Sequence, residues 1–310
     1  MPCNYPSSMS TGSRPLILLL LLGISWGLYF SMLKIAVLSG ISYTGILTLT
    51  TVGVAVGMCA IALLRGRRPE FQRRHMVFYL VCALCGYLLP MIAELLVIAH
   101  MPAGVLTLIV SMAPLATLLL AWLVKTDNIS PARVGGILVG AIAIFAILLP
   151  DAHLGEAVAW RWLLLAMLVP ICYAVHHNFT ARCWPEGSDS YQVACGEAIF
   201  AALLLLAFSA FHWQWQDVQS WNRGHGAILF MATIALVDIY IYFELIRIKG
   251  PIYTSHANYF MVVSGVGWGM VIFGERPSSL MWLSAALLMV SLYLVSRPGS
   301  DRPESPEVEG

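Results

Sequence analysis

The chain has 310 residues, of which 59% are hydrophobic and 11% are charged, and its mean hydropathy is +0.81. Soluble domains usually carry roughly a quarter of charged residues, so this chain could not cover its own surface in water and lipid must be its solvent. The formal net charge of +1 leaves no basic face for nucleic acid, which we exclude as a partner.

A helix that spans a bilayer needs about 20 mostly apolar residues, and stretches of that length recur along nearly the whole chain. They predict ten transmembrane helices, over residues 15–36, 43–64, 76–98, 103–124, 132–149, 162–181, 191–211, 226–246, 252–273 and 278–296. The gaps between them are too short for a soluble domain. We therefore predict an all-α integral membrane protein, with an N-terminal segment over 1–14 and a disordered tail over 298–310.

Positively charged residues are divided unevenly between the predicted loops, and this division sets the orientation. If the N-terminus is cytoplasmic, 13 of the 17 Lys and Arg residues fall on the inner side and 4 on the outer side. We therefore place both termini in the cytoplasm. The pattern fits a bacterial inner membrane, so we expect a multi-pass protein of the cell membrane.

Glycines four residues apart recur in the predicted helices, at Gly23/Gly27, Gly53/Gly57, Gly136/Gly140 and Gly265/Gly269. Such pairs let two helix backbones approach closely where no hydrophobic effect drives association. We favour tight packing within the chain as their role, and a homodimer is the alternative.

Motifs for bound metals and nucleotides are scarce. Cys82 and Cys85 form a CxxC motif, but the second ligand pair that a structural zinc needs is missing. We interpret the cysteines as small packed side chains. The sequence has no GxxxxGK[ST] loop, no HExxH and no GxSxG, so we expect no cofactor, and any transport must draw on a gradient.

The two halves of the chain are alike. The stretch 111–130 matches the stretch 259–278, about 148 residues later, with Glu275 in the place of Asp127. Five helices per half is an odd number, so the halves must be inverted relative to each other in the membrane. Inverted repeats place a substrate site near the midplane, where they meet. The predicted repeats cover residues 15–149 and 150–297.

At these residues the chain resembles the EamA-type permeases of the drug/metabolite transporter superfamily. The matching elements are Trp26-Gly27 with Lys34 in the first helix, Pro114 with the apolar run after it, and Gly274-Glu275-Arg276 before the tenth helix. The resemblance covers roughly residues 15–297. It implies a secondary carrier that works by alternating access, often an exporter of amino acids, metabolites or amphipathic drugs.

Two positions depart from the family pattern. Lys125-Thr126-Asp127-Asn128 replaces the usual Gly-Glu-Arg in the first half, and Val262 stands where the second half often has Pro. Loss of that Pro removes a kink in the ninth helix, so gating there is expected to differ.

An ionisable side chain in the middle of a bilayer is expensive and is therefore a functional candidate. Asp238 lies about 12 residues, or roughly 18 Å, into the eighth helix, close to the midplane. Tyr242, four residues on, shares its face. A carboxylate there could bind a cationic amine, exchange protons or pair with a fixed partner. A structural hydrogen bond in a closed bundle is the alternative.

His176, His177 and Asn178 form the most polar patch of any predicted helix. Adjacent residues on a helix point about 100° apart, so at most one of the histidines easily faces a cavity. Histidine titrates near physiological pH and could relay protons. Hydrogen bonding to a neighbouring helix explains the patch equally well.

Other acidic residues lie towards the helix ends. Glu94 and Lys34 are both predicted near the outer surface, where they could pair as a gate or attract a charged substrate. Snorkelling of Lys34 to the interface is the alternative. Glu197 and Glu244 are predicted near the cytoplasmic ends of their helices, and we favour interfacial ion pairs over an inner gate, with Arg247 available to Glu244.

Aromatic residues complete the candidate site. Trp26 and Trp268 could form apolar walls or cation–π contacts. His256, Asn258 and Tyr259 open the ninth helix and are expected to line the same cavity. Packing against lipid or other helices is the alternative for each aromatic residue.

Three prolines fall near helix centres, at positions 90, 114 and 170. Proline removes a backbone donor and kinks a helix. Such breaks suit gating, although they also serve to shape a bundle.

These observations favour a secondary carrier of a small molecule, with Asp238 and a histidine of the sixth helix at the central site and the proton as candidate coupling ion. The alternative is a membrane-embedded enzyme acting on a lipid or lipid-linked substrate, which would need a catalytic motif. A receptor or scaffold would need a signalling domain or long loops. A central Asp among aromatic residues suggests an amine or zwitterion as substrate.

Overall fold

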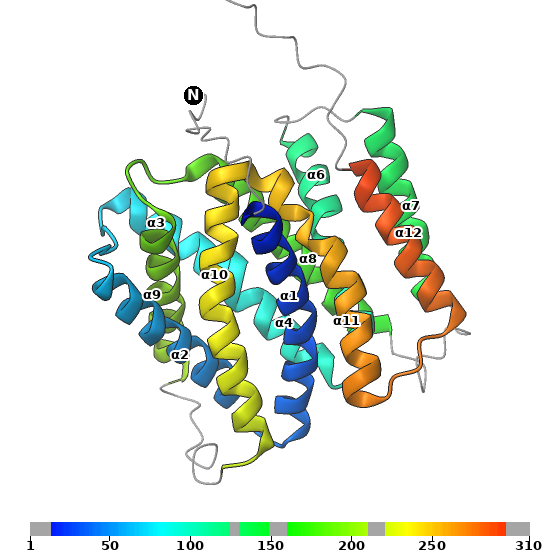
Figure 1. The fold of residues 1–310 in the computed structure, drawn as a ribbon, viewed down its shortest axis with the longest axis horizontal. Helices are drawn as coiled ribbons and strands as arrows, with labels where there is room; N and C mark the ends of the chain where they lie inside the picture. The colour runs from blue at the N-terminus through cyan, green and yellow to red at the C-terminus, as the bar shows by residue number, and fades with distance from the viewer. Residues whose placement is uncertain (1–13, 125–129, 149–159, 210–220, 296–310) are drawn as a thin grey trace, which may run out of the picture.

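The computed structural model describes residues 14–124, 130–148, 160–209 and 221–295, and within them the chain is helical (Figure 1). The helices of the first half are α1 (Arg14–Leu38), α2 (Tyr43–Leu64), α3 (Arg73–Cys82), the π-helical turn η1 (Ala83–Leu88), α4 (Leu89–Ile98), α5 (Ala103–Val110), α6 (Ala113–Leu123) and α7 (Pro131–Leu148). Those of the second half are α8 (Trp160–Cys183), α9 (Ser190–Ser209), α10 (Arg223–Ser255), α11 (Ala257–Phe273) and α12 (Ser279–Val295).

Ten spans account for these helices, as predicted. The third span is α3, η1 and α4 in continuous succession, and the fourth is α5 and α6, which are separated by a short break before Pro114. Gly250 has a left-handed φ of 81° inside α10, so the eighth span ends there and the ninth begins. Eight stretches are long and apolar enough to cross a membrane, and Pro131–Ala143 and Ser279–Val295 are shorter apolar helices.

Prolines at positions 90, 114 and 170 have different consequences. Pro90 is the second residue of α4, just after the π-helical turn, and Pro114 is the second residue of α6, which begins the second part of a broken span. Pro170 lies inside α8, which continues through it. The predicted interruptions therefore occur at two of the three prolines.

The outer surface of the bundle is apolar. Leu64, Val271 and Leu164 expose 88, 77 and 61% of their surface, and many other large hydrophobic side chains are also exposed. A surface of this kind would promote aggregation in water. It is the surface that a bilayer requires, and it confirms lipid as the surrounding solvent.

The two halves run in opposite directions through the bundle. Lys34, near the end of α1, contacts Glu275, which in turn contacts the first residue of α5, Ala103. A few residues before α5, His100 stacks on Trp162 at the start of α8, with ring centroids 3.9 Å apart. Helix α8 therefore starts at the end of the molecule where α1 finishes, so the first spans of the two halves are antiparallel.

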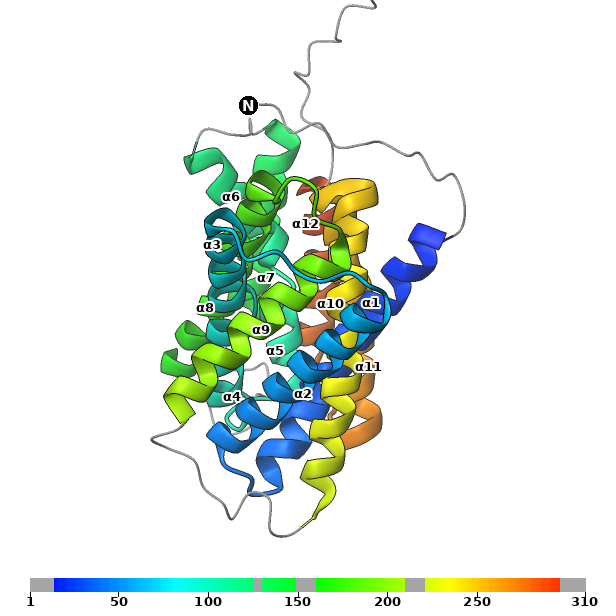
Figure 2. The same cartoon turned by 90° about the vertical axis from the view of Figure 1, so that its left-hand side faces the viewer.

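Contacts between helices show that each element of one half has a counterpart in the other half. Helix α1 packs on α10 and α11, and its counterpart α8 packs on α4 and α6. Helices α2 and α9 pair across the halves, as do α7 and α12, which lie side by side at one edge of the bundle (Figures 1 and 2). Exchange of the two halves leaves this pattern unchanged, which is the arrangement of inverted repeats.

Glycines at the predicted small-residue positions make contacts within the chain. A side chain at Gly27 would collide with Ser264 and with the backbone of Gly265, and one at Gly23 with Ala257 and Phe260. The α1–α11 contact therefore needs glycine at both positions.

The other glycine pairs are used in the same way. Gly53 and Gly57 face Ala232 and Leu236 of α10, and Gly136 and Gly140 face the Ser291 region of α12. In the fourth pair, Gly265 faces Thr107 of α5, and Gly269 faces Glu275. All four pairs therefore make packing contacts within the chain. The homodimer stays a prediction, and none of these glycine pairs supports it.

We expect Gly27→Ala to destabilise the protein by about 1–3 kcal/mol, because the added methyl group overpacks the α1–α11 contact. Gly267→Ala is the matched control, because no atom lies within 4 Å of a Cβ built there. The control should be neutral or stabilising by up to about 1 kcal/mol, since Ala is the better helix former. Thermal unfolding in detergent measures both, and equal unfolding temperatures would contradict this account of the contact.

Candidate functional site

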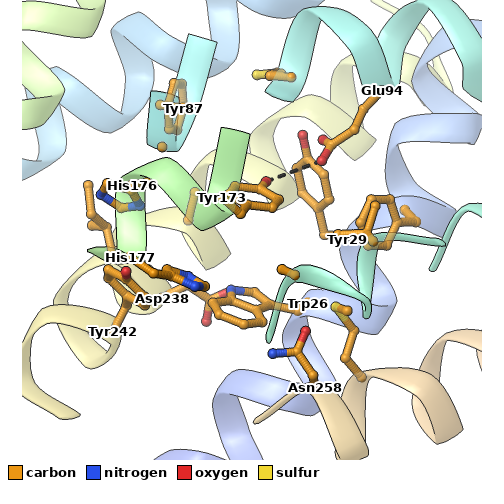
Figure 3. Close-up of a pocket in the computed structure, with 18 of the residues that line it drawn as sticks. Trp26, Tyr29, Tyr87, Glu94, Tyr173, His176, His177, Asp238, Tyr242 and Asn258 are labelled. Atoms are coloured by element: carbon orange, nitrogen blue, oxygen red, sulfur yellow. Dashed lines mark hydrogen bonds between the residues drawn. The ribbon is translucent and has the colours of Figure 1, made fainter. Parts of the chain in front are cut away.

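A cavity of about 160 Å³ lies in the middle of the bundle (Figure 3). Both halves of the chain line it, with residues from α1, η1, α4, α5, α6, α8, α9, α10 and α11. This volume accommodates several water molecules or a small organic molecule. Its polar and aromatic lining residues are Trp26, Tyr29, Phe30, Tyr87, Glu94, Tyr173, His176, His177, Glu197, Asp238, Tyr242 and Asn258.

The π-helical turn η1 shapes one wall of the cavity. Its residues Gly86 and Tyr87 both line the space. A side chain at Gly86 would come within 2.6 Å of the His176 ring, so glycine is needed for the histidine to occupy its position. π-Helical turns inside α-helices are rare and are frequent at functional sites.

Asp238 is 8% exposed and lies on α10. Its Oδ1 accepts a hydrogen bond of 2.7 Å from the Ser25 hydroxyl of α1. In Figure 3 the carboxylate lies beside His177, Trp26 and Tyr242. One ionisable group is therefore held at the contact between the first span and the eighth, within the cavity.

Aromatic rings surround Asp238. The Tyr242 ring stacks on His176 and His177, with centroids 5.4 and 5.6 Å apart, and tilts against Trp26 at 6.3 Å. His177 stacks in turn on Tyr173 at 6.4 Å. Both histidines line the cavity, although adjacent residues were expected to direct only one of them inward. The space lies between several helices, so side chains about 100° apart both reach it.

Glu94 forms a second acidic position in the cavity. It is 1% exposed, and its Oε1 accepts a hydrogen bond of 3.2 Å from the Tyr173 hydroxyl, with Tyr29 beside them (Figure 3). The lining reaches from Gly86 to Glu94, about 12 Å of helix. Glu94 therefore faces the cavity although it lies nearer the helix end. Its position along the sequence had indicated only a place near the outer surface.

Glu197 forms the third acidic position. It was expected in an interfacial ion pair, but it lines the cavity and is 3% exposed. Its Oε1 lies 3.9 Å from His176 Nε2, too far for a hydrogen bond, and the Nε2 atom has no hydrogen-bond partner within the described part of the chain.

Five predicted site residues lie outside the cavity lining: Lys34, Asn178, His256, Tyr259 and Trp268. The Asn178 amide donates to the Thr117 and Ala174 carbonyl oxygens, at 3.0 and 2.9 Å. Tyr259 packs with the Leu115 cluster between α6 and α12, and Lys34 lies near the end of α1. Asn258, the neighbour of Tyr259, does line the cavity, since the two side chains point about 100° apart.

Lys34 pairs with Glu275 and not with Glu94. The Lys34 Nζ lies 2.9 Å from Glu275 Oε1 and 4.9 Å from the centroid of the Phe273 ring. The same carboxylate accepts hydrogen bonds from the backbone N–H groups of Ala103 and Gly104, at 3.0 and 3.4 Å, at the start of α5. One carboxylate thus joins α1, α5 and the loop after α11.

This contact explains the Gly-Glu part of the second-half motif. Gly274 ends α11 with a left-handed φ of 64°, which turns the chain so that Glu275 faces α5 and Lys34. Gly269 leaves room for the carboxylate, because a side chain there would collide with it. The corresponding first-half residues, 125–128, lie outside the described part of the chain.

Helix α1 is also tied at its other end. Glu244 of α10 accepts two hydrogen bonds from Arg247, at 2.8 and 2.9 Å, and one of 3.1 Å from Ser190. Arg14, the first residue of α1, lies 3.7 Å from the same carboxylate. The expected pairing of Glu244 with Arg247 is present.

Sequence reasoning missed several lining residues. Tyr87, Tyr173 and Glu197 were not assigned to the site, and Ser25 was not recognised as the partner of Asp238. Tyr173 precedes His177 by one helical turn, so the face of α8 was a usable signal. Ser25 and Tyr87 gave none, because polar residues of their type also serve as ordinary packing residues in membrane helices.

The inverted helical halves and the cavity between them are features of multi-pass membrane transporters. The EamA-like transporter family model matches the chain twice, over residues 13–149 and 160–297. The chain belongs to this family, which is part of the drug/metabolite transporter superfamily.

Individual relatives are more distant. The "Uncharacterized transporter sll0355" of Synechocystis sp. (strain ATCC 27184 / PCC 6803 / Kazusa) is 27% identical over 215 residues, and the match spans 63% of this chain and 63% of the relative. A solved crystal structure superposes on 91% of this chain and 97% of its own, with a TM-score of 0.62 and 17% identity. At that identity the structure supports the fold alone.

We expect Lys34→Met and Glu275→Gln each to lower stability, and the double variant to lose less than the sum. Each single variant leaves a partly buried polar group without its charged partner. The coupling in a double-mutant cycle should be about 0.5–3 kcal/mol, measured from unfolding in detergent. Additive losses would mean that Lys34 reaches the interface independently of Glu275.

Proposed function

We propose that this protein is a secondary carrier, and that the central cavity is its substrate site. The observation that supports this most is that both inverted repeats line one largely apolar cavity, which holds three carboxylates and two histidines. Small relative movements of the repeats can expose such a site first to one side of the membrane and then to the other. The moving units would be the repeats over 15–149 and 150–297.

The sequence contains no Walker-type nucleotide loop, so the energy would come from an ion or substrate gradient. Glu94, Glu197, Asp238 and the two histidines are the groups in the cavity that could carry a proton. Exchange of protons for substrate at these groups would couple the two flows. We propose export of small amphipathic molecules across a bacterial inner membrane, in keeping with the family resemblance and the distribution of Lys and Arg.

Contacts at the two ends of α1 are candidates for the gates. In the proposed orientation the Lys34–Glu275 pair lies at the outer end, and the Glu244 contacts with Arg14 and Arg247 lie at the inner end. Each contact joins α1 to elements of the second half. Opening towards one side would break the contact at that side and keep the other.

The orientation predicts different labelling of two surface positions. In a cysteine-free background, Trp221→Cys should react with a membrane-impermeant maleimide in intact cells, because Trp221 precedes α10 on the proposed outer side and is 75% exposed. Arg68→Cys, after α2 on the inner side, should react only after the cells are permeabilised. The reverse pattern would place both termini outside.

Alternating access predicts that a cavity residue can be reached from both sides of the membrane. Ile234→Cys, in the same background, should react with a small impermeant methanethiosulfonate in right-side-out and in inverted vesicles. Leu108→Cys is the control, because Leu108 is fully buried and does not line the cavity. It should stay unreactive in both preparations.

A cross-link then tests the outer gate. A short bis-maleimide bridge between Lys34→Cys and Glu275→Cys should abolish the reaction of Ile234→Cys from outside and preserve the reaction from inside. Reaction of Ile234→Cys from a single side in the unbridged protein would contradict the carrier mechanism. It would favour a receptor or a membrane enzyme with one entrance.

A further inference from the structure

The cavity is lined by acidic side chains without matching basic ones. Glu94, Glu197 and Asp238 line it, and among its described lining residues there is no Lys or Arg. Lys34, which lies near one end of α1, is paired with Glu275 outside the cavity. The carboxylates therefore have no fixed cation of the protein within the space that they enclose.

Hydrogen bonds only partly compensate for this lack. Asp238 accepts one from Ser25, and Glu94 accepts hydrogen bonds from Tyr173 and Tyr29, while Glu197 has His176 Nε2 at 3.9 Å. A buried charge in a low-dielectric setting must be paired or neutralised. Each carboxylate in the empty cavity is expected to hold a proton, unless a mobile cation takes the place of that proton.

The neutral lining also suits a cation. The faces of Trp, Tyr and Phe rings attract positive charge, and Trp does so most strongly. Trp26 and Tyr242 lie in contact on one side of Asp238, and Tyr29 and Tyr173 lie beside Glu94 (Figure 3). Ring faces and acidic oxygens thus occur together at both positions.

A substrate carboxylate would find no Lys or Arg side chain here, and only His176 and His177 among the lining residues could become positively charged. An amino acid or an organic anion would place its negative group among three acidic side chains and without a guanidinium or ammonium group. One of the two N–H groups of the Asn258 amide donates to the Ser255 carbonyl, at 2.9 Å, which leaves one neutral donor. The lining therefore discriminates against anions and zwitterions and admits compact cations.

We propose that the transported molecule is an organic cation, a protonated amine or quaternary ammonium with a compact apolar or aromatic body. Asp238 is its main counter-ion, because Trp26 stands beside it, and Glu94 is the second. This inference rests on the proposed role of the cavity as the transport site. When the cation binds, a protonated carboxyl group loses its proton to solvent and becomes the carboxylate that pairs with the cation, so charge in the cavity is conserved.

Four probes that share a phenyl ring test the charge requirement: benzyltrimethylammonium, benzyl alcohol, phenylalanine and benzenesulfonate. Binding is measured by calorimetry on the full chain in lipid nanodiscs, and proton release is followed in weak buffer. The ammonium probe should bind at least about tenfold more tightly than the other three and should release protons. Equal or tighter binding of any other probe, or no binding of the ammonium probe, overturns the cation assignment.

Variants locate the counter-ion. Asp238→Asn should weaken binding of the ammonium probe at least about tenfold and Glu94→Gln should weaken it less, while Asp238→Glu should retain binding. Glu186→Gln is the control, because its carboxylate is exposed and distant from the cavity lining. It should bind as the wild type does. Unfolding temperatures identify a variant that is misfolded, and wild-type affinity in a folded Asp238→Asn protein overturns the role of Asp238.

The two proposals can fail separately. Access of the Ile234→Cys thiol from both sides together with selective binding of phenylalanine or benzenesulfonate would leave the carrier function in place and reject the cation. Access from a single side together with tight binding of the ammonium probe would retain the cation site and reject the carrier mechanism.

Discussion

The close contact of α1 with α11 is the constraint on which the rest of the structure depends. Gly23 and Gly27 allow the backbones to meet, which dispersion forces and good packing must stabilise because lipid provides no hydrophobic drive between helices. With the register of α1 set in this way, Ser25 and Trp26 are held at the cavity and Lys34 at the loop after α11. Packing, site and candidate gate are therefore consequences of one helix–helix contact.

Charged residues are distributed according to the cost of burial. Glu275 and Glu244 lie towards opposite ends of α1, and both accept several hydrogen bonds or ion pairs. The acidic residues of the cavity have only neutral partners or a histidine in the described structure: Ser25 for Asp238, Tyr173 and Tyr29 for Glu94, and His176 for Glu197. Residues with full sets of partners stabilise the bundle, whereas residues with incomplete sets remain available to a ligand or a proton. This difference separates structural acids from candidate functional ones more clearly than depth alone.

Much of the fold could be predicted from the sequence, because its signals are local. A run of about 20 apolar residues is sufficient to identify a span, and glycines four apart identify a contact surface on a helix. The odd number of spans per half also determined the inversion. The π-helical turn before Pro90 and the break before Pro114 were anticipated only as kinks, since proline removes a hydrogen bond without specifying how the backbone adjusts.

Position along a helix was enough to predict some residues that line the cavity, but it did not predict the direction of a side chain or a partner far away in the sequence. Asp238, His176 and Trp26 lie in the middle of their helices, and all three line the cavity. Asn178 and Tyr259 point away from it because one residue along a helix rotates a side chain by about 100°. The Lys34–Glu275 pair joins residues 241 positions apart, and no local pattern could select Glu275 over Glu94.

The Ser25–Asp238 hydrogen bond links the proposed binding event to movement of the helices. It joins α1 to α10 between the two end contacts of α1, at 2.7 Å. A cation that pairs with Asp238 competes for the same carboxylate oxygens and so weakens a contact between the repeats. A ligand shifts a conformational equilibrium only by its difference in affinity for the two states. In the proposed site Asp238 is both the counter-ion and a contact between the repeats, so the cation binds the two conformational states with different affinity. Return of a proton to Asp238 would remove this effect.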